Sequence, residues 1–128
     1  MPEVKKAHCP APDLVVTACR TYAAATHAPS PAKGSAVLIS EGIELLAEAR
    51  RDAPKLVEVC RSKYPRFGGE ISAHIPSSVR EQARHLKRVR AFASLQDLYL
   101  EAILKGLTKH GFLGPDLEPA PAPERAGG

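Results

Sequence analysis

The side chains best suited to metal binding or nucleophilic catalysis are five histidines and three cysteines. No two of them have the Cys-x₂₋₄-Cys or His-x₃₋₅-His spacing of a zinc site. His8 and Cys9 are adjacent, so they point to opposite faces of a strand, and only His8 and His74 could meet if two strands paired. The cysteines fall in apolar stripes, and the sequence has no Ser/His/acid grouping and no glycine-rich phosphate loop. We therefore predict no catalytic residue, no metal, no cofactor and no enzymatic activity.

Basic side chains are concentrated in the middle of the chain. The 128 residues carry a formal net charge of +4. Residues 1–53 are neutral, with six basic and six acidic side chains, whereas residues 54–92 hold nine basic side chains against three acidic ones. This local excess indicates a polyanionic partner, and the alternative is a solvated basic face that maintains solubility.

Cysteine usage and the N-terminal residues bear on the cellular compartment. Three cysteines without Cys-x-x-Cys spacing are typical of reduced, buried thiols in a cytoplasmic protein. Residues 1–6 have no apolar stretch behind their charges, unlike a signal peptide, and no run approaches the roughly 18 apolar residues of a membrane span. We expect a soluble cytoplasmic protein without a membrane partner.

Hydrophobic periodicity predicts two strands and several helices. Residues 70–75 alternate polar and apolar side chains and end at Pro76, as in a strand with one dry face. Residues 4–9 alternate in the same way. Ser35 and Ser94 have the chemistry of helix N-caps, and Gly111 that of a helix stop. The predicted helices span 13–25, 36–51, 55–63, 77–90 and 95–109.

The two halves of the chain resemble one another. Residues 7–10 (AHCP) align with 73–76 (AHIP) after a shift of 66 positions, and 38–43 align with 98–103 after a shift of 60. Both halves therefore have the order strand, Pro, helix, turn, helix, with a turn six residues longer in the first half. We predict a mainly α fold with a two-stranded antiparallel β-ribbon formed by residues 4–9 and 70–75. The predicted parts are a first half (1–51), a linker with a short helix (52–69), a second half (70–112) and a disordered Pro/Ala-rich tail (113–128).

This element order resembles the ribbon-helix-helix family of DNA-binding proteins, such as Arc, MetJ and CopG. The resemblance covers residues 70–111 most clearly and extends to residues 4–51. A chain with two copies of this motif is similar to TraY-type proteins and to the T-DNA border-binding accessory proteins. The resemblance implies a single-chain tandem pseudo-dimer, monomeric in solution, that inserts its ribbon into the major groove of double-stranded DNA. It also implies an accessory role in plasmid or T-DNA transfer, at the relaxosome, with a relaxase or other transfer protein as a further partner.

The resemblance implies three sets of DNA-binding residues. Lys6 would donate to guanine, Ser72 would bond to several bases, and Glu70 would accept from cytosine. Because Val4 and Glu70 depart from the family's cationic and amide side chains, we expect an asymmetric, non-palindromic site. The predicted base-reading residues are Lys6, His8, Glu70, Ser72 and His74. The predicted phosphate-binding helix starts are Ser35, Ala36, Ser94, Leu95 and Gln96. The predicted flanking contacts are Lys5, Arg61, Lys63, Arg66, Arg80, Arg84, Lys87 and Arg88.

Several alternatives remain at this level. The outward face of the ribbon could be an ordinary solvated strand face, the two serines could be simple caps, and the basic side chains could be solvated. A transcriptional repressor or partition factor would share the same DNA-binding surface. An antitoxin-like or scaffold module would use its second half to bind a protein, but residues 115–128 have no amphipathic extension for that purpose.

Overall fold

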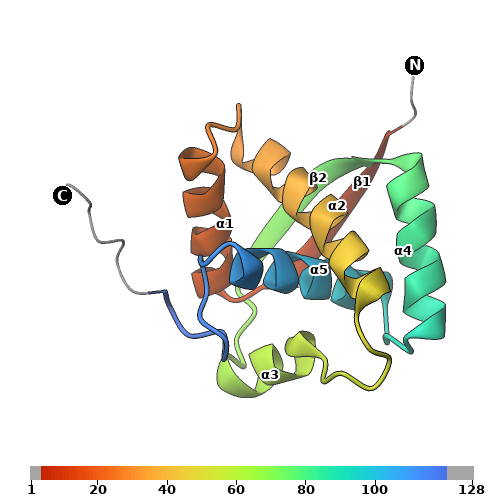
Figure 1. Cartoon of the computed structure of the whole chain (residues 1–128). Coiled ribbons are helices and arrows are strands. Elements are labelled where there is room, and N and C mark those ends of the chain that lie inside the picture. The colour runs from red at the N-terminus through yellow and green to blue at the C-terminus, as the bar shows by residue number, and fades with distance from the viewer. Residues whose placement is uncertain (1–3, 121–128) are drawn as a thin grey trace.

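The computed structural model describes residues 4–120 and has a mixed α/β fold (Figure 1). Within these residues, two strands form one antiparallel sheet, and there are five helices. Figure 1 shows α2 and α5 crossing in front of the strands, with α1 and α4 on either side and α3 below. The elements in chain order are β1 (Val4–Ala11), α1 (Asp13–Ala25), α2 (Pro31–Glu48), α3 (Leu56–Lys63), β2 (Gly69–Pro76), α4 (Ser77–Val89) and α5 (Leu95–Lys109).

The two strands pair as the alternating sequence predicted. Lys6 lies opposite His74, and His8 lies opposite Ser72. The predicted antiparallel pairing of residues 4–9 with 70–75 is confirmed, and both strands extend slightly beyond those limits. Small and aliphatic side chains cover the inner face, which is buried. These inner residues are Ala7, Cys9, Ala11, Ile71, Ala73 and Ile75.

The inner face of the sheet packs on the crossed helices α2 and α5. These two helices contribute most of the largest fully buried side chains, including Leu38 and Ile43 from α2 and Ile103 from α5. They approach closely because Gly42 lies against the α5 backbone. A Cβ atom built on Gly42 would be 1.9 Å from the carbonyl oxygen of Ala102, a distance that no side chain can occupy. Burial of this aliphatic surface is the main force holding the two helices on the sheet.

Corresponding features of the two halves are separated by a constant 64 positions. Pro12 and Pro76 precede the first helix of each half, and α1 and α4 both contain 13 residues. The later pairs of features are the caps Ser30 and Ser94, the positive-φ residues His27 and Ala91, and the close-packed glycines Gly42 and Gly106. The predicted shifts of 66 and 60 positions are therefore wrong, and the first turn is not longer than the second.

The sequence-based limits of α2 are also wrong. The helix begins at Pro31 and ends at Glu48, not at residues 36 and 51, and Ser35 is buried inside it rather than capping it. Ser30 is the cap, and its hydroxyl accepts a 3.2 Å hydrogen bond from the Lys33 N–H. Gly34 lies inside the helix, and a glycine is needed there because α1 packs against it, with the Ala23 Cβ only 2.7 Å from a Cβ built on Gly34. The glycine is therefore a contact between helices and not part of a loop.

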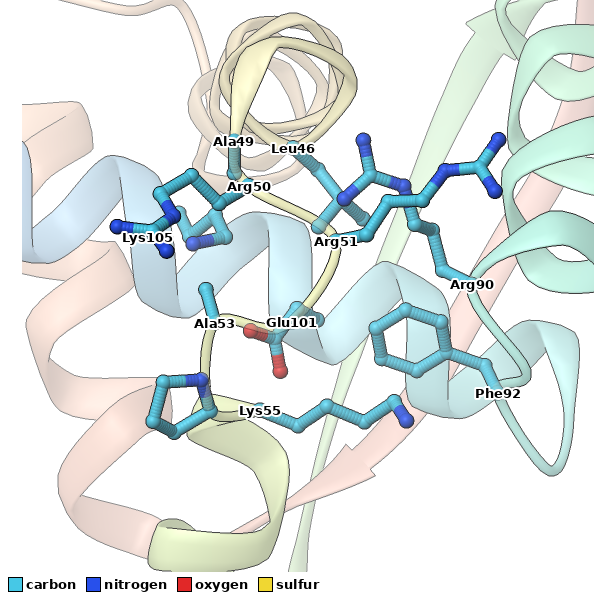
Figure 2. Close-up of a pocket in the computed structure, with 11 residues that line it drawn as sticks. Leu46, Ala49, Arg50, Arg51, Ala53, Lys55, Arg90, Phe92, Glu101 and Lys105 are labelled. Atoms are coloured by element: carbon cyan, nitrogen blue, oxygen red, sulfur yellow. The ribbon is translucent and has the colours of Figure 1, made fainter.

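Glu101 of α5 caps the linker helix α3. One carboxylate oxygen accepts a 2.9 Å hydrogen bond from the Leu56 N–H, and the other accepts a 2.8 Å bond from the Val57 N–H. Glu101 is only 1% exposed, and burial raises its pKa while the two N–H donors act in the opposite direction. Figure 2 shows this carboxylate in a hollow lined by basic side chains. The bond pair fixes the linker to the second half of the chain.

The segment after α5 is ordered against the core. Leu113 and Leu117 are buried, and the Tyr64 hydroxyl donates a 2.9 Å hydrogen bond to the Leu117 carbonyl. The prediction of a disordered tail from residue 113 is therefore wrong for residues 113–120, because two leucines anchor a stretch that composition alone marks as unstructured. The rest of that predicted tail, residues 121–128, lies outside the described part of the chain.

Replacement of Gly42 by alanine should destabilise the protein. The added methyl group would overlap the Ala102 backbone, and overpacking of this kind costs about 1–3 kcal/mol, of which the better helix propensity of alanine offsets at most about 1 kcal/mol. Chemical denaturation of Gly42→Ala measures this loss. Gly68→Ala is the matched control, because its nearest neighbour would be the Asp13 carboxylate at 4.0 Å, and its stability should be unchanged. Equal stability of the two variants would contradict the proposed close approach of α2 and α5.

Replacement of Glu101 by alanine should lower the free energy of unfolding by about 2–4 kcal/mol. Two buried N–H groups would lose their acceptors, and each costs about 1–3 kcal/mol when it is left without a partner. Denaturant titration measures the loss, and Glu58→Ala, an exposed acid on α3 itself, serves as the charge-matched control. A Glu101→Ala protein as stable as this control would exclude the capping role.

Candidate nucleic-acid interface

The outward face of the ribbon carries the polar side chains that the sequence predicted. Lys6, Glu70, Ser72 and His74 are exposed, and His8 is partly exposed. Their order in the register puts Lys6 and His74 side by side, with the His8–Ser72 pair next along the ribbon. The face therefore presents an ammonium group, two imidazoles, a hydroxyl and a carboxylate, which together supply both hydrogen-bond donors and acceptors.

The start of α5 reaches the outward face of this ribbon. The Gln96 side-chain nitrogen lies 3.2 Å from His8 Nε2, and the same imidazole nitrogen lies 3.5 Å from a carboxylate oxygen of Glu70. His8 therefore joins β1, β2 and α5 in one polar group. Of the predicted base-reading residues, His8 and Glu70 contact each other, which leaves Lys6, Ser72 and His74 as the more available side chains.

The N-termini of α2 and α5 flank the ribbon. Ser94 caps α5 by accepting a 3.1 Å hydrogen bond from the Asp97 N–H, so the predicted start at Ser94, Leu95 and Gln96 is confirmed. The corresponding start of α2 is Ser30, Pro31 and Ala32, not the predicted Ser35 and Ala36. The Ser-Pro pair is itself a helix-start signal, since proline suits the first helical position, and it was the sequence feature that could have identified this end.

The two flanking ends have different surroundings. Beside α5, a hollow is lined by the basic side chains of α4 and by the connection to α5. Beside α2, a hollow between α1 and β2 is lined by mostly uncharged residues together with Arg20 and Glu70. The basic residues of the first hollow are Arg80, Arg84, Lys87 and Arg88. All four predicted α4 cations are therefore brought together beside the start of α5.

The other predicted flanking residues do not line this basic hollow. Arg61 forms a 2.5 Å ion pair with Asp97, and Lys63 donates a 3.0 Å hydrogen bond to the Asp116 carbonyl. Arg66 is exposed in the connection before β2, and Lys5 is half-buried on β1. Arg61 and Lys63 thus hold the linker helix and the C-terminal segment in place, an arrangement that their spacing in the sequence does not reveal.

A second group of basic residues surrounds Glu101 on another part of the molecule. In Figure 2 the strands pass behind α5, and this hollow opens in front of the helix. Arg50 pairs with Asp52 at 3.3 Å, Arg90 donates to the Ala47 carbonyl at 3.3 Å, and Lys55 lies 5.2 Å from the centre of the Phe92 ring. These cations therefore make contacts within the fold.

The cysteines are buried thiols. Burial raises the pKa of Cys9 and of Cys19 to about 12, and that of Cys60 to about 11. Within residues 4–120, no group of three or more His, Cys, Asp or Glu side chains is arranged to hold a metal ion. Nor does any helix in that range have the length and apolar character to cross a membrane.

Comparison with protein-family models, with curated proteins and with solved structures gives no significant match.

The thiols should resist alkylation in the folded protein. A cysteine reacts as its thiolate, and pKa values of about 11 to 12 leave almost none of it at neutral pH. Labelling with iodoacetamide should be slow in buffer and fast in denaturant. Thr21→Cys provides the control, because this exposed α1 position should react at once in the folded state. Rapid labelling of the native wild-type protein would show that the thiols are accessible.

Proposed function

We propose that this chain is a single-chain tandem ribbon-helix-helix protein that binds duplex DNA through its β1–β2 ribbon. The observation that carries the proposal is the contact between Gln96 and His8, which puts the start of α5 beside the outward face of the ribbon. A two-stranded ribbon fits the major groove, where its outward side chains meet base edges. Free N–H groups at the flanking helix starts would then face the phosphates on the groove edge.

The constant 64-residue spacing supports the tandem part of the proposal. Each half has a strand, a proline, a 13-residue helix and a serine-capped helix in the same order. The contacts between halves are also reciprocal, since Gly42 lies against Ala102 and Gly106 lies against Leu38, the residue 64 positions before Ala102. Such reciprocity is what a two-fold interface has when both copies belong to one chain.

The two copies would present different side chains to DNA. Positions 64 apart on the outward face pair Lys6 with Glu70 and His8 with Ser72. A donor on one half-site would therefore correspond to an acceptor on the other, and the preferred DNA site would be non-palindromic. This asymmetry suits a site with a direction, as at a transfer origin or border sequence, and supports the narrower role of accessory factor in plasmid or T-DNA transfer.

Binding to duplex DNA tests the proposal directly. A duplex selected from a randomised library should bind with nanomolar to micromolar affinity, measured by fluorescence anisotropy, and the affinity should fall steeply as salt rises. Lys6→Ala and His74→Ala should each weaken binding roughly fivefold or more, since a good base contact is worth about 1–3 kcal/mol.

Lys109→Ala removes the same charge at the opposite end of α5 and should leave the affinity unchanged. If no duplex binds at low salt, or if Lys109→Ala weakens binding as much as Lys6→Ala, the ribbon is not the DNA-binding surface. A relaxase that is recruited only when the selected duplex is present would distinguish the transfer role from that of a repressor.

A further inference from the structure

The basic hollow beside the start of α5 is a feature that the other half of the molecule lacks. It is formed by four cations of α4 together with Ala91, Phe92 and Leu95. Leu95 is the first residue of α5 and adjoins Gln96, which contacts His8 on the ribbon. The hollow therefore lies beside the start of α5, one position from the residue through which this helix contacts the ribbon.

Two buried polar atoms near this hollow lack partners within the described residues. They are Nε of Arg80 and the hydroxyl oxygen of Tyr99, a residue that is only 3% exposed. Burial raises the pKa of Tyr99, whereas the charges of Arg80 and Arg84 act in the opposite direction. Arg80 itself lines the hollow, so its guanidinium group has unused hydrogen-bonding capacity beside it.

The α4 cations are only weakly neutralised by neighbouring acids. Arg84 lies 3.8 Å from Glu81, and both of these side chains are well exposed, so that pair contributes little. The hollow therefore holds a net positive charge in a concave surface, an arrangement that concentrates anions.

The equivalent positions of the first half are not basic. The residues 64 positions before Arg80, Lys87 and Arg88 are Val16, Ala23 and Ala24, and only Arg84 has a basic counterpart, Arg20. The hollow on that side is lined by Val16 and Arg20 and also by the acidic Glu70. The two hollows therefore differ by several charges, although α1 and α4 correspond in length and position.

We infer that the hollow formed by Arg80, Arg84, Lys87 and Arg88 binds backbone phosphate of the same duplex that the ribbon enters, beyond the phosphates that face the two helix starts, and that the hollow beside α2 makes no such additional contact. This inference rests on the proposed function. The additional phosphates would be held on the α4 side alone, so the charge of α4 would fix which way the protein lies on its DNA. The bases read by the ribbon and the phosphates held by α4 would thus specify orientation together.

The salt dependence of DNA binding tests the inference. The logarithm of the binding constant falls with the logarithm of salt concentration by about 0.9 for each phosphate that is neutralised. The double variant Arg84→Gln/Arg88→Gln should reduce this slope by about 2, and Arg20→Gln, the counterpart of Arg84 in the first half, should leave it unchanged. Ethylation interference should mark phosphates beyond the ribbon on one side of the selected duplex only.

The possible outcomes are distinct. The wild-type protein could bind DNA while the double variant and Arg20→Gln show the same salt slope. That result would overturn the inference but leave the proposed function intact. The α4 cluster would then suit an acidic protein partner. Symmetric interference would overturn it as well. If the wild-type protein binds no duplex, the proposed function fails and the phosphate site fails with it. A reduced slope for the double variant alone, with one-sided interference, would establish the site.

Discussion

The contact between Gly42 and the backbone of Ala102 is the constraint on which the rest of the structure depends. It lets α2 and α5 cross with almost no side chain between them, so their flanking leucines and isoleucines meet in one continuous core. The same crossing directs the start of each helix toward the ribbon. At the α5 start, Gln96 contacts His8, which in turn lies beside Glu70.

A second set of contacts fixes the parts that do not belong to either half. Glu101 of α5 bonds to the start of α3, and Arg61 of α3 forms an ion pair with Asp97 of α5. Tyr64 bonds to Leu117 of the C-terminal segment. The linker is therefore an integral part of the core surface. Its basic residues illustrate that a cluster of positive charge in a sequence can be divided between structural ion pairs and a surface that is open to a partner.

Periodicity and helix-cap chemistry predicted the strands, the limits of α1 and α5, and the residues that face outward on the ribbon. They failed where a residue's conformation depends on a distant neighbour. Gly34 resembles a loop residue in sequence but lies inside α2, where Ala23 leaves no room for a side chain. Leu113 and Leu117 lie among prolines and glycines, yet the core buries them. Similarly, alternation identified His8 as outward, but only the folded chain brings Gln96, 88 positions away in sequence, into contact with it.

The pairing of β1 with β2 has a consequence for the order of events during synthesis. Val4 pairs with Pro76, so β1 has no partner until β2 has been made. Over that interval α2 lacks α5, and its apolar surface is uncovered. Completion of this core must therefore wait for α5, and the segment from β1 to α3 is exposed to aggregation until then.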